Sequence, residues 1–94
     1  MIFKTTLRKL QFDKQLWLQN REQRIYMITS LMDCKLLNGL TKKEVLKTLG
    51  FEFNDINSDT WSYYIGTRRR IFRVKCFLFI YFDGLGRVYK VLKK

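Results

Sequence analysis

The sequence predicts an α+β domain in which two N-terminal helices (an αα-hairpin) pack on one face of a three-stranded antiparallel meander sheet. Over the first half of the chain, apolar residues recur every three or four positions, which is the period of amphipathic helices. From Thr60 onward the period changes to two, which is typical of strands. Because the helical segments precede the strands, we expect the helices to gather on one side of an antiparallel sheet.

Length and composition indicate one folded domain covering residues 1–94. The chain is 47% hydrophobic and 16% aromatic, which is far from the apolar-poor composition of disordered proteins. It contains no proline and only five glycines, so no segment has the composition of a flexible linker. Residues 1–12 are of mixed character, and we expect them to be extended or frayed.

The first helical segments are predicted between residues 13 and 37. Asp13 is a suitable N-cap for a short helix that reaches residue 20. A longer helix is predicted over residues 21–37 because its apolar residues form one stripe, made of Ile25, Ile28, Leu31, Met32 and Leu36. The dipeptide Asn38-Gly39 then provides the usual left-handed helix end.

The next helix has the clearest local signals in the chain. Thr41 and Glu44 have the spacing of a capping box, in which each side chain satisfies a free backbone N–H of the first turn. Val45, Leu46 and Leu49 are its expected core residues, and Gly50 is its expected end. A tight turn before Thr41 therefore predicts two antiparallel helices.

Three strands follow a polar loop. Residues 54–59 are rich in Asn, Asp and Ser, which favour turns. Alternation predicts a first strand over residues 60–66, a long second strand over 71–82 and a third over 87–92. Asp83 to Gly86 is a strong hairpin-turn sequence between the last two strands.

The two faces of the long second strand differ in chemistry. The apolar face, which we expect to lie under the helices, consists of Phe72, Val74, Cys76, Leu78, Ile80 and Phe82. The other face begins basic and ends aromatic, with Arg73, Lys75, Phe77, Phe79 and Tyr81. If helices cover only one face, these aromatic residues form a candidate binding surface. The alternative is that the N-terminal segment or a second subunit covers them as core.

An arginine cluster is predicted in the turn between the first two strands. It consists of Arg68, Arg69 and Arg70, with Arg73 next along the chain. Guanidinium groups bind carboxylates and phosphates through paired hydrogen bonds, so this cluster is a candidate anion site. The alternative is a solvated hairpin tip whose charges discourage edge-to-edge aggregation.

The net charge of the chain indicates which classes of partner it attracts. Nineteen Lys and Arg residues against eight Asp and Glu residues give a formal net charge of +11. Such a field attracts acidic protein surfaces, nucleic acid or anionic lipid, although excess lysine also simply keeps a domain soluble. No apolar run reaches the length of a membrane span.

Catalysis is not expected from this composition. The chain has no histidine, and its carboxylates are scattered along the sequence, some of them used in caps and turns. No phosphate-binding loop, nucleophile motif or metal-ligand set occurs, so we predict no cofactor and no metal site. Cys34 and Cys76 are expected to be buried, reduced thiols, a bridge between them being the alternative in an oxidising compartment.

Residues 75–82 partly match the RNA-recognition strand in which alternate aromatic side chains stack on bases. The match fails at Cys76 and Leu78, where that motif has small residues, and the order of helices and strands also differs. Stacking of single-stranded nucleic acid on a basic aromatic sheet needs no such motif.

Three sequence blocks resemble the SmpA/OmlA (BamE-like) family over residues 39–92. They are Gly39 to Gly50, which has the form G-x-T-x-x-E-V ending in L-G, the block Trp61 to Tyr64, and Phe79 to Val88 with its F-D-x-x-G-x-V ending. Residues 12–32 are similar to small uncharacterised Bacteroidetes-type proteins. The chain differs from the family in having Phe51-Glu52-Phe53 in place of a proline after L-G, and no lipoprotein cysteine near its start.

The resemblance implies an αα-βββ sandwich of the kind also found in β-lactamase-inhibitor-like domains. It further implies a module without an active site that binds proteins in cell-envelope assembly or as an inhibitor. We therefore expect a non-catalytic domain that binds an acidic protein through its aromatic face and its arginines. A single-stranded nucleic-acid-binding module and an immunity or inhibitor protein are the alternatives.

The N-terminal sequence lacks the apolar core of a signal peptide. It predicts a cytoplasmic protein if the chain is full length, and a cell-envelope protein if an export segment was removed. The sequence leaves the oligomeric state open.

Overall fold

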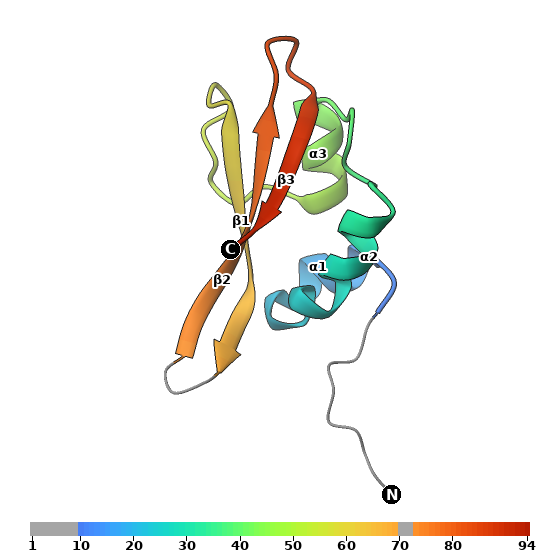
Figure 1. Cartoon of the computed structure of the whole chain (residues 1–94), viewed down its shortest axis with the longest axis vertical. Coiled ribbons are helices and arrows are strands. Elements are labelled where there is room, and N and C mark those ends of the chain that lie inside the picture. The colour runs from blue at the N-terminus through green and yellow to red at the C-terminus, as the bar shows by residue number, and fades with distance from the viewer. Residues whose placement is uncertain (1–9, 70–72) are drawn as a thin grey trace, which may run out of the picture.

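A computed structural model describes residues 10–69 and 73–94, and for Arg69 the backbone alone. Helices precede a three-stranded antiparallel sheet (Figure 1), which confirms the predicted α+β class. The elements in chain order are α1 (Lys14–Gln19), the 3-10 helix η1 (Arg21–Met27), α2 (Ile28–Asp33), α3 (Lys42–Leu49), β1 (Thr60–Arg69), β2 (Arg73–Phe82) and β3 (Val88–Lys93).

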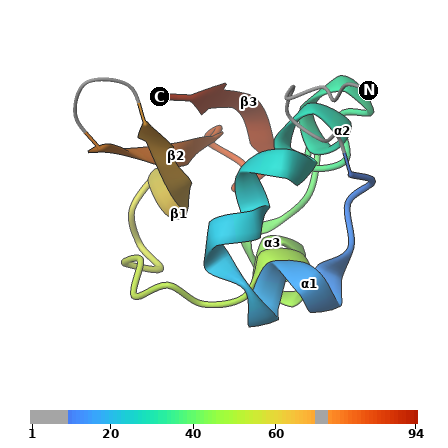
Figure 2. The ribbon, with the colours of Figure 1, turned by 90° about the horizontal axis from the view of Figure 1, so that it is seen from below.

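The sheet is a simple meander with the strand order β1-β2-β3. The helices lie on one side of it, as the view from below shows (Figure 2). β2 is the central strand along most of its length, but its residues 73–76 have β1 as their sole strand partner in the described chain. The end of the β1–β2 hairpin therefore projects as a two-stranded ribbon beyond β3 (Figure 1).

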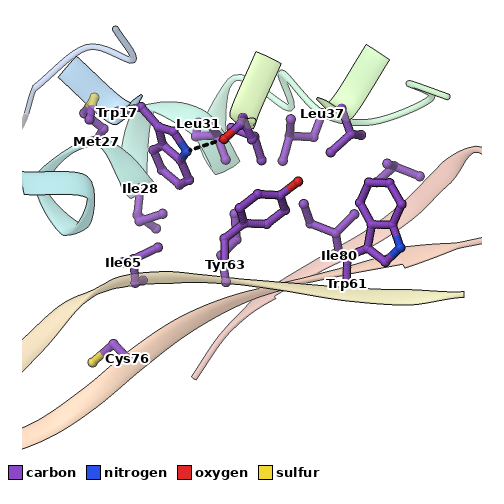
Figure 3. Close-up of a cluster of buried hydrophobic side chains, with 14 of the residues drawn as sticks. Trp17, Met27, Ile28, Leu31, Leu37, Trp61, Tyr63, Ile65, Cys76 and Ile80 are labelled. Carbon is purple, nitrogen blue, oxygen red and sulfur yellow. Dashed lines mark hydrogen bonds between the residues drawn. The ribbon is translucent and has the colours of Figure 1, made fainter. Parts of the chain in front are cut away.

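The core lies between the helices and the sheet (Figure 3). Trp17 of α1 and Tyr63 of β1 are fully buried, and both donate hydrogen bonds to the C-terminal end of α3. The Trp17 indole N–H donates to the Leu49 carbonyl at 3.1 Å, and the Tyr63 hydroxyl donates to the Gly50 carbonyl at 2.8 Å. The last carbonyls of a helix have no partner within it. The two aromatic side chains therefore satisfy this helix end while they fill the core.

The caps of α1 and α3 are confirmed. The Asp13 carboxylate accepts the backbone N–H groups of Gln15 and Leu16 at the start of α1. At the start of α3, the Thr41 hydroxyl accepts the Glu44 N–H while the Glu44 carboxylate accepts the Thr41 N–H. The backbone hydrogen bond from Thr41 lowers the pKa of Glu44. Gly50, with φ +86°, ends the helix as expected.

The single helix predicted over residues 21–37 is wrong. The segment instead contains η1, α2 and a series of turns. α2 stops because Lys35 adopts φ +52°, with its N–H bonded to the Met32 carbonyl and the Leu36 N–H bonded to the Leu31 carbonyl. This bond pair is the Schellman arrangement, which glycine usually occupies, so the lysine gave no sequence signal. Leu36 consequently leaves the predicted stripe and is 43% exposed.

The cysteines are free, and one of them departs from expectation. Cys76 is buried in the sheet as predicted. Cys34 is exposed because it is the C-cap of α2 and no longer belongs to a helical stripe. In the part of the chain that the structure describes, no helix has the length and apolar character needed to cross a bilayer.

The first hairpin is longer than predicted. β1 continues through Arg69, whereas the sequence pattern ended it at Gly66. A bulge shifts the register between Tyr64 and Gly66, and this break in the alternation resembles a strand end. Gly66 has φ +133°, and a Cβ there would lie 3.3 Å from the Glu22 carbonyl of η1. Both the positive φ and the close approach of η1 therefore favour glycine at this position.

The second hairpin and β3 follow the prediction closely. The Asp83 carboxylate accepts the N–H groups of Leu85 and Arg87 at 2.9 and 3.0 Å, which closes the predicted turn. β3 begins one residue later than expected and extends to Lys93.

Side chains cover the outer edge of β1. The Asn54 amide donates to the Ser62 carbonyl and accepts the Ser62 N–H, both at 3.0 Å, as a neighbouring strand would. At the next outward-facing residue, the Tyr64 N–H donates to Glu52 at 3.2 Å and the Tyr64 carbonyl accepts from Arg24 at 2.8 Å. At Ser62 and Tyr64 this edge is therefore closed to pairing with another chain.

Arg24 is the centre of this closure. Only 3% of it is exposed, and its guanidinium forms a salt bridge with Glu52, donates to the Trp17 carbonyl at 2.8 Å and lies 4.6 Å from the centre of the Trp17 ring. A buried guanidinium is tolerated when its charge is paired and its donors are used. Arg24 thus joins α1, η1, the 52–54 loop and β1.

Candidate functional site

The predicted aromatic face of β2 lies on the side of the sheet opposite the helices. Cys76, Leu78, Ile80 and Phe82 are buried toward the helices, and the intervening Phe77, Phe79 and Tyr81 are half-buried. The alternation predicted from the sequence is therefore confirmed over this part of β2. Val74 is an exception, because it lies in the projecting ribbon and is 45% exposed instead of lying under the helices. Phe72 lies outside the described residues.

The strand register identifies the neighbours of these rings. On β1, Ser62 lies opposite Phe79 and Tyr64 opposite Phe77. On β3, Lys90 lies opposite Tyr81 and Leu92 opposite Phe79, and Lys94 exchanges both backbone hydrogen bonds with Phe77. Directly opposed residues of antiparallel strands share a face. We call this surface the open face; its residues are Ser62, Tyr64, Lys75, Phe77, Phe79, Tyr81, Lys90, Leu92 and Lys94.

The aromatic rings of the open face pack side by side. The ring centres of Tyr64 and Phe77 are 5.9 Å apart with an interplanar angle of 70°, and those of Phe77 and Phe79 are 6.3 Å apart at 49°. These are favourable edge and tilted arrangements. Mutual contact covers the flanks of the rings, which accounts for their half-burial on a face that carries no helix in the described chain.

Lysine ammonium groups lie over two of these rings. The Lys90 Nζ is 4.8 Å from the centre of the Tyr81 ring, and the Lys94 Nζ is 5.2 Å from the centre of the Phe79 ring. Each pair is a cation–π contact. An ammonium group on a ring keeps N–H donors directed away from it, so the open face presents positive donors above an aromatic floor.

Tyr64 links the open face to η1. Its hydroxyl donates to the Glu22 carboxylate at 2.6 Å, and the Arg21 guanidinium lies 4.9 Å from the centre of its ring. The hydrogen bond to Glu22 raises the pKa of Tyr64, since it favours the protonated phenol. This contact holds Tyr64 at one side of the aromatic row.

The predicted arginine cluster is distributed along the ribbon and is not confined to a turn. Arg68 belongs to β1, is exposed and lies opposite Val74, whereas Arg69 lies opposite Arg73. Neighbouring strand residues point to opposite faces. Arg73 therefore lies on the same face of the ribbon as the exposed Lys75, and Arg68, which is opposite Val74, lies on the other face. Arg70 lies outside the described residues.

Sequence reasoning missed part of this site. Tyr64, Lys90, Leu92 and Lys94 join the open face through the register between strands, which the sequence of one strand does not contain. A signal did exist for β3, because its alternation places Lys90, Leu92 and Lys94 on one face. The bulge before Gly66 obscured the corresponding signal in β1.

A second exposed apolar group also escaped prediction. Phe51 and Phe53 are 63% and 90% exposed, and their rings meet edge to face with centres 5.2 Å apart. Phe53 has φ +59°, a strained conformation for a bulky residue. The strain has a local cause, because Phe53 stands between Glu52 and Asn54, whose side chains both reach the edge of β1.

Comparison with protein-family models, with curated proteins and with solved structures finds no match for this chain. The interpretation of the open face therefore depends on its own geometry.

Proposed function

We propose that this domain is a non-catalytic protein-interaction module whose open face binds an acidic surface of another protein. The observation that carries the proposal is the pair of lysines placed over half-buried rings, Lys90 on Tyr81 and Lys94 on Phe79. A carboxylate that meets such an ammonium group gains a charge-assisted hydrogen bond. Apolar atoms beside it gain contact with Phe77 and Leu92.

The charge of the molecule supports the same interpretation. With a net charge of +11, the domain attracts an acidic partner from a distance, and the attraction weakens as salt is added. The projecting ribbon adds the exposed Arg73 and Lys75 on the face that carries the aromatic residues, and the exposed Arg68 on the opposite face. The resemblance of residues 39–92 to the SmpA/OmlA family also favours a protein-binding role. An immunity or inhibitor protein would use the same surface and differ only in its partner.

Single-stranded nucleic acid is the alternative ligand for this surface. Bases stack on the faces of aromatic rings, but here Lys90 and Lys94 lie over the faces of Tyr81 and Phe79. Stacking would first require these lysines to leave the rings, whereas a carboxylate can bind with the lysines in place. The geometry therefore favours an acidic protein.

The test compares cross-linking from a position on the open face with cross-linking from a control position on α3. A photo-reactive residue at position 79 should cross-link an acidic protein in the source cell, whereas the same residue at the exposed position 47 of α3 should not. The substitutions K90E and K94E together should abolish the cross-link. Binding of oligothymidylate at physiological salt, lost in Phe79→Ser, would instead establish the nucleic-acid alternative.

A further inference from the structure

The outer edge of β3 carries backbone groups that face away from the sheet. Its first residue is covered, since the Val88 N–H donates to the Leu40 carbonyl and the Val88 carbonyl accepts the Gly39 N–H, both at 2.9 Å. Lys94 directs its N–H and carbonyl inward to Phe77. Successive residues of a strand direct these groups to opposite sides. The N–H and carbonyl groups of Lys93 and Val91 therefore point outward, and within the described chain none of them has a partner in a neighbouring strand.

A groove of about 240 Å³ lies beside this edge. Leu31, Met32 and Leu37 line it from the helix side, and Tyr89 and Val91 from β3. The segment 39–40 pairs with Val88 at the start of the edge, and Leu37 and Asn38, which precede it in the chain, line the groove. An extended chain placed there would find both hydrogen-bonding groups and apolar contacts, which are the two requirements for strand addition.

The charges around the edge select the occupant. Lys35 and Lys90 are the charged residues of the groove lining, and neither the lining nor β3 contains a carboxylate. Lys94 lies on the same face as Lys90, whereas Lys93 lies opposite Leu78 on the helix side, at the end of the strand. A second copy paired through β3 would place these lysines against their own counterparts, and like charges across a strand pair are destabilising. An acidic segment from another protein is complementary to them.

We propose that β3 accepts an extended acidic segment of another protein as an additional strand of the sheet. Side chains of an added strand alternate between the two faces. Those on the helix side enter the groove and should be apolar. Those on the other side lie next to Lys90 and Lys94 and should be acidic. The segment that fits is thus an alternating apolar–acidic strand, which pairs with Val91 and Lys93. This edge shares Lys90 and Lys94 with the open face but binds through backbone groups of Val91 and Lys93 instead of the aromatic rings, so the inference goes beyond the function proposed above.

The test uses a synthetic peptide of about eight residues, a usual strand length, that alternates valine and glutamate. The full-length protein is titrated with it and followed by amide NMR and hydrogen exchange. We expect saturable binding that slows exchange at Val91 and Lys93.

The variants Lys93→Pro and Lys93→Ala lose the same charge, but only proline removes the outward N–H. Proline should therefore weaken binding by about tenfold and alanine by about twofold, because only proline leaves a peptide carbonyl unpaired. Melting curves check that both variants remain folded.

Four results would overturn the proposal. One is equal loss of affinity in the two Lys93 variants, which would mean that the lysine charge, and not the backbone N–H, binds the peptide. The second is equal binding of the matching valine–lysine peptide. The third is concentration-dependent dimerisation that protects Val91 and Lys93 without peptide, which would make a second copy the occupant. The fourth is loss of binding in Phe79→Ser, which would move the peptide to the open face. Failure of the edge variants alone leaves the function proposed for the open face intact, so the two proposals fail separately.

Discussion

The two edges of the sheet differ in whether their outward backbone groups have hydrogen-bond partners. At β1, the side chains of Asn54, Glu52 and Arg24 take every outward backbone group of Ser62 and Tyr64. At β3, the segment 39–40 covers Val88 and then departs, which leaves Val91 and Lys93 facing outward. An exposed edge invites pairing with other chains, and proteins normally protect it. Ser62 and Tyr64 of β1 are therefore protected from pairing with another chain, whereas Val91 and Lys93 of β3 remain available for it.

Removing the cation at the centre of the closed edge should have the largest effect. Arg24→Met removes the buried ion-pair partner of Glu52, which keeps only the exposed Arg21 and the Tyr64 N–H. It also leaves the Tyr64 and Trp17 carbonyls without the Arg24 donor, so we expect a loss of about 3–5 kcal/mol in the free energy of unfolding. Denaturation in urea measures it. Arg21→Met is the matched control, because Arg21 contacts the same carboxylate at 3.4 Å but has a side chain 57% exposed. It should lose less than about 1 kcal/mol. Equal losses would show that burial of Arg24 is irrelevant.

Proline at the two edges compares them directly. Both Ser62 and Lys93 direct their N–H away from β2, so proline interrupts no ladder bond at either residue. Ser62→Pro removes the bond to Asn54 and leaves the Asn54 oxygen unpaired, and we expect a loss of about 2 kcal/mol. Lys93→Pro should change stability by less than about 0.5 kcal/mol. Similar melting temperatures for the two variants would contradict the distinction between a closed and an open edge.

Phe53 tests how the closed edge is held in place. Its φ of +59° suits asparagine far better than phenylalanine. We expect Phe53→Asn to stabilise the domain by about 1 kcal/mol, because the ring is 90% exposed and little packing is lost. Phe51→Asn, with the same chemical change at a residue that lacks positive φ, should bring no gain. Thermal unfolding distinguishes the two, and a destabilised Phe53→Asn would mean that the phenyl ring supports the loop.

The smallest effect concerns alkaline pH at Tyr64. Because its hydrogen bond to Glu22 raises the pKa of Tyr64 above the ordinary value of 10.0, the folded state holds this proton more tightly than the unfolded state. The resulting stabilisation is complete below about pH 10 and disappears as the pH rises through the folded-state pKa. Burial raises the pKa of Tyr63 as well, so wild type should be compared with Tyr64→Phe. We expect the stability of the variant to fall less steeply above pH 10; parallel curves would argue against the Glu22 contact.

Local signals in the sequence were sufficient for much of the fold. The capping box at Thr41, the turn at Asp83 and the alternation of β2 over residues 76–82 each depend on residues close together in the chain, and all three were predicted correctly. The break in the segment 21–37 was not predictable in this way, because Lys35 occupies a left-handed position that lysine rarely adopts.

The sequence predicted only part of the candidate site. Phe77, Phe79 and Tyr81 follow from the period of one strand, but the lysines over their rings depend on the register of β3. Arg24 and Glu52 are far apart in sequence, and no local pattern distinguishes Arg24 from an exposed arginine or shows that the 52–54 loop returns to meet it. Contacts of this kind are formed only by the tertiary structure and produce no periodic pattern in the sequence.

The projecting end of the first hairpin has a consequence for how a partner is first met. The ribbon extends past β3. Its exposed residues include Arg68 and Val74 on one face and Arg73 and Lys75 on the other. Cations on both sides of a narrow arm can touch an acidic molecule that approaches from many directions, before the rest of the domain is correctly oriented. Such an arm enlarges the target for productive collision, so the association rate should depend strongly on ionic strength.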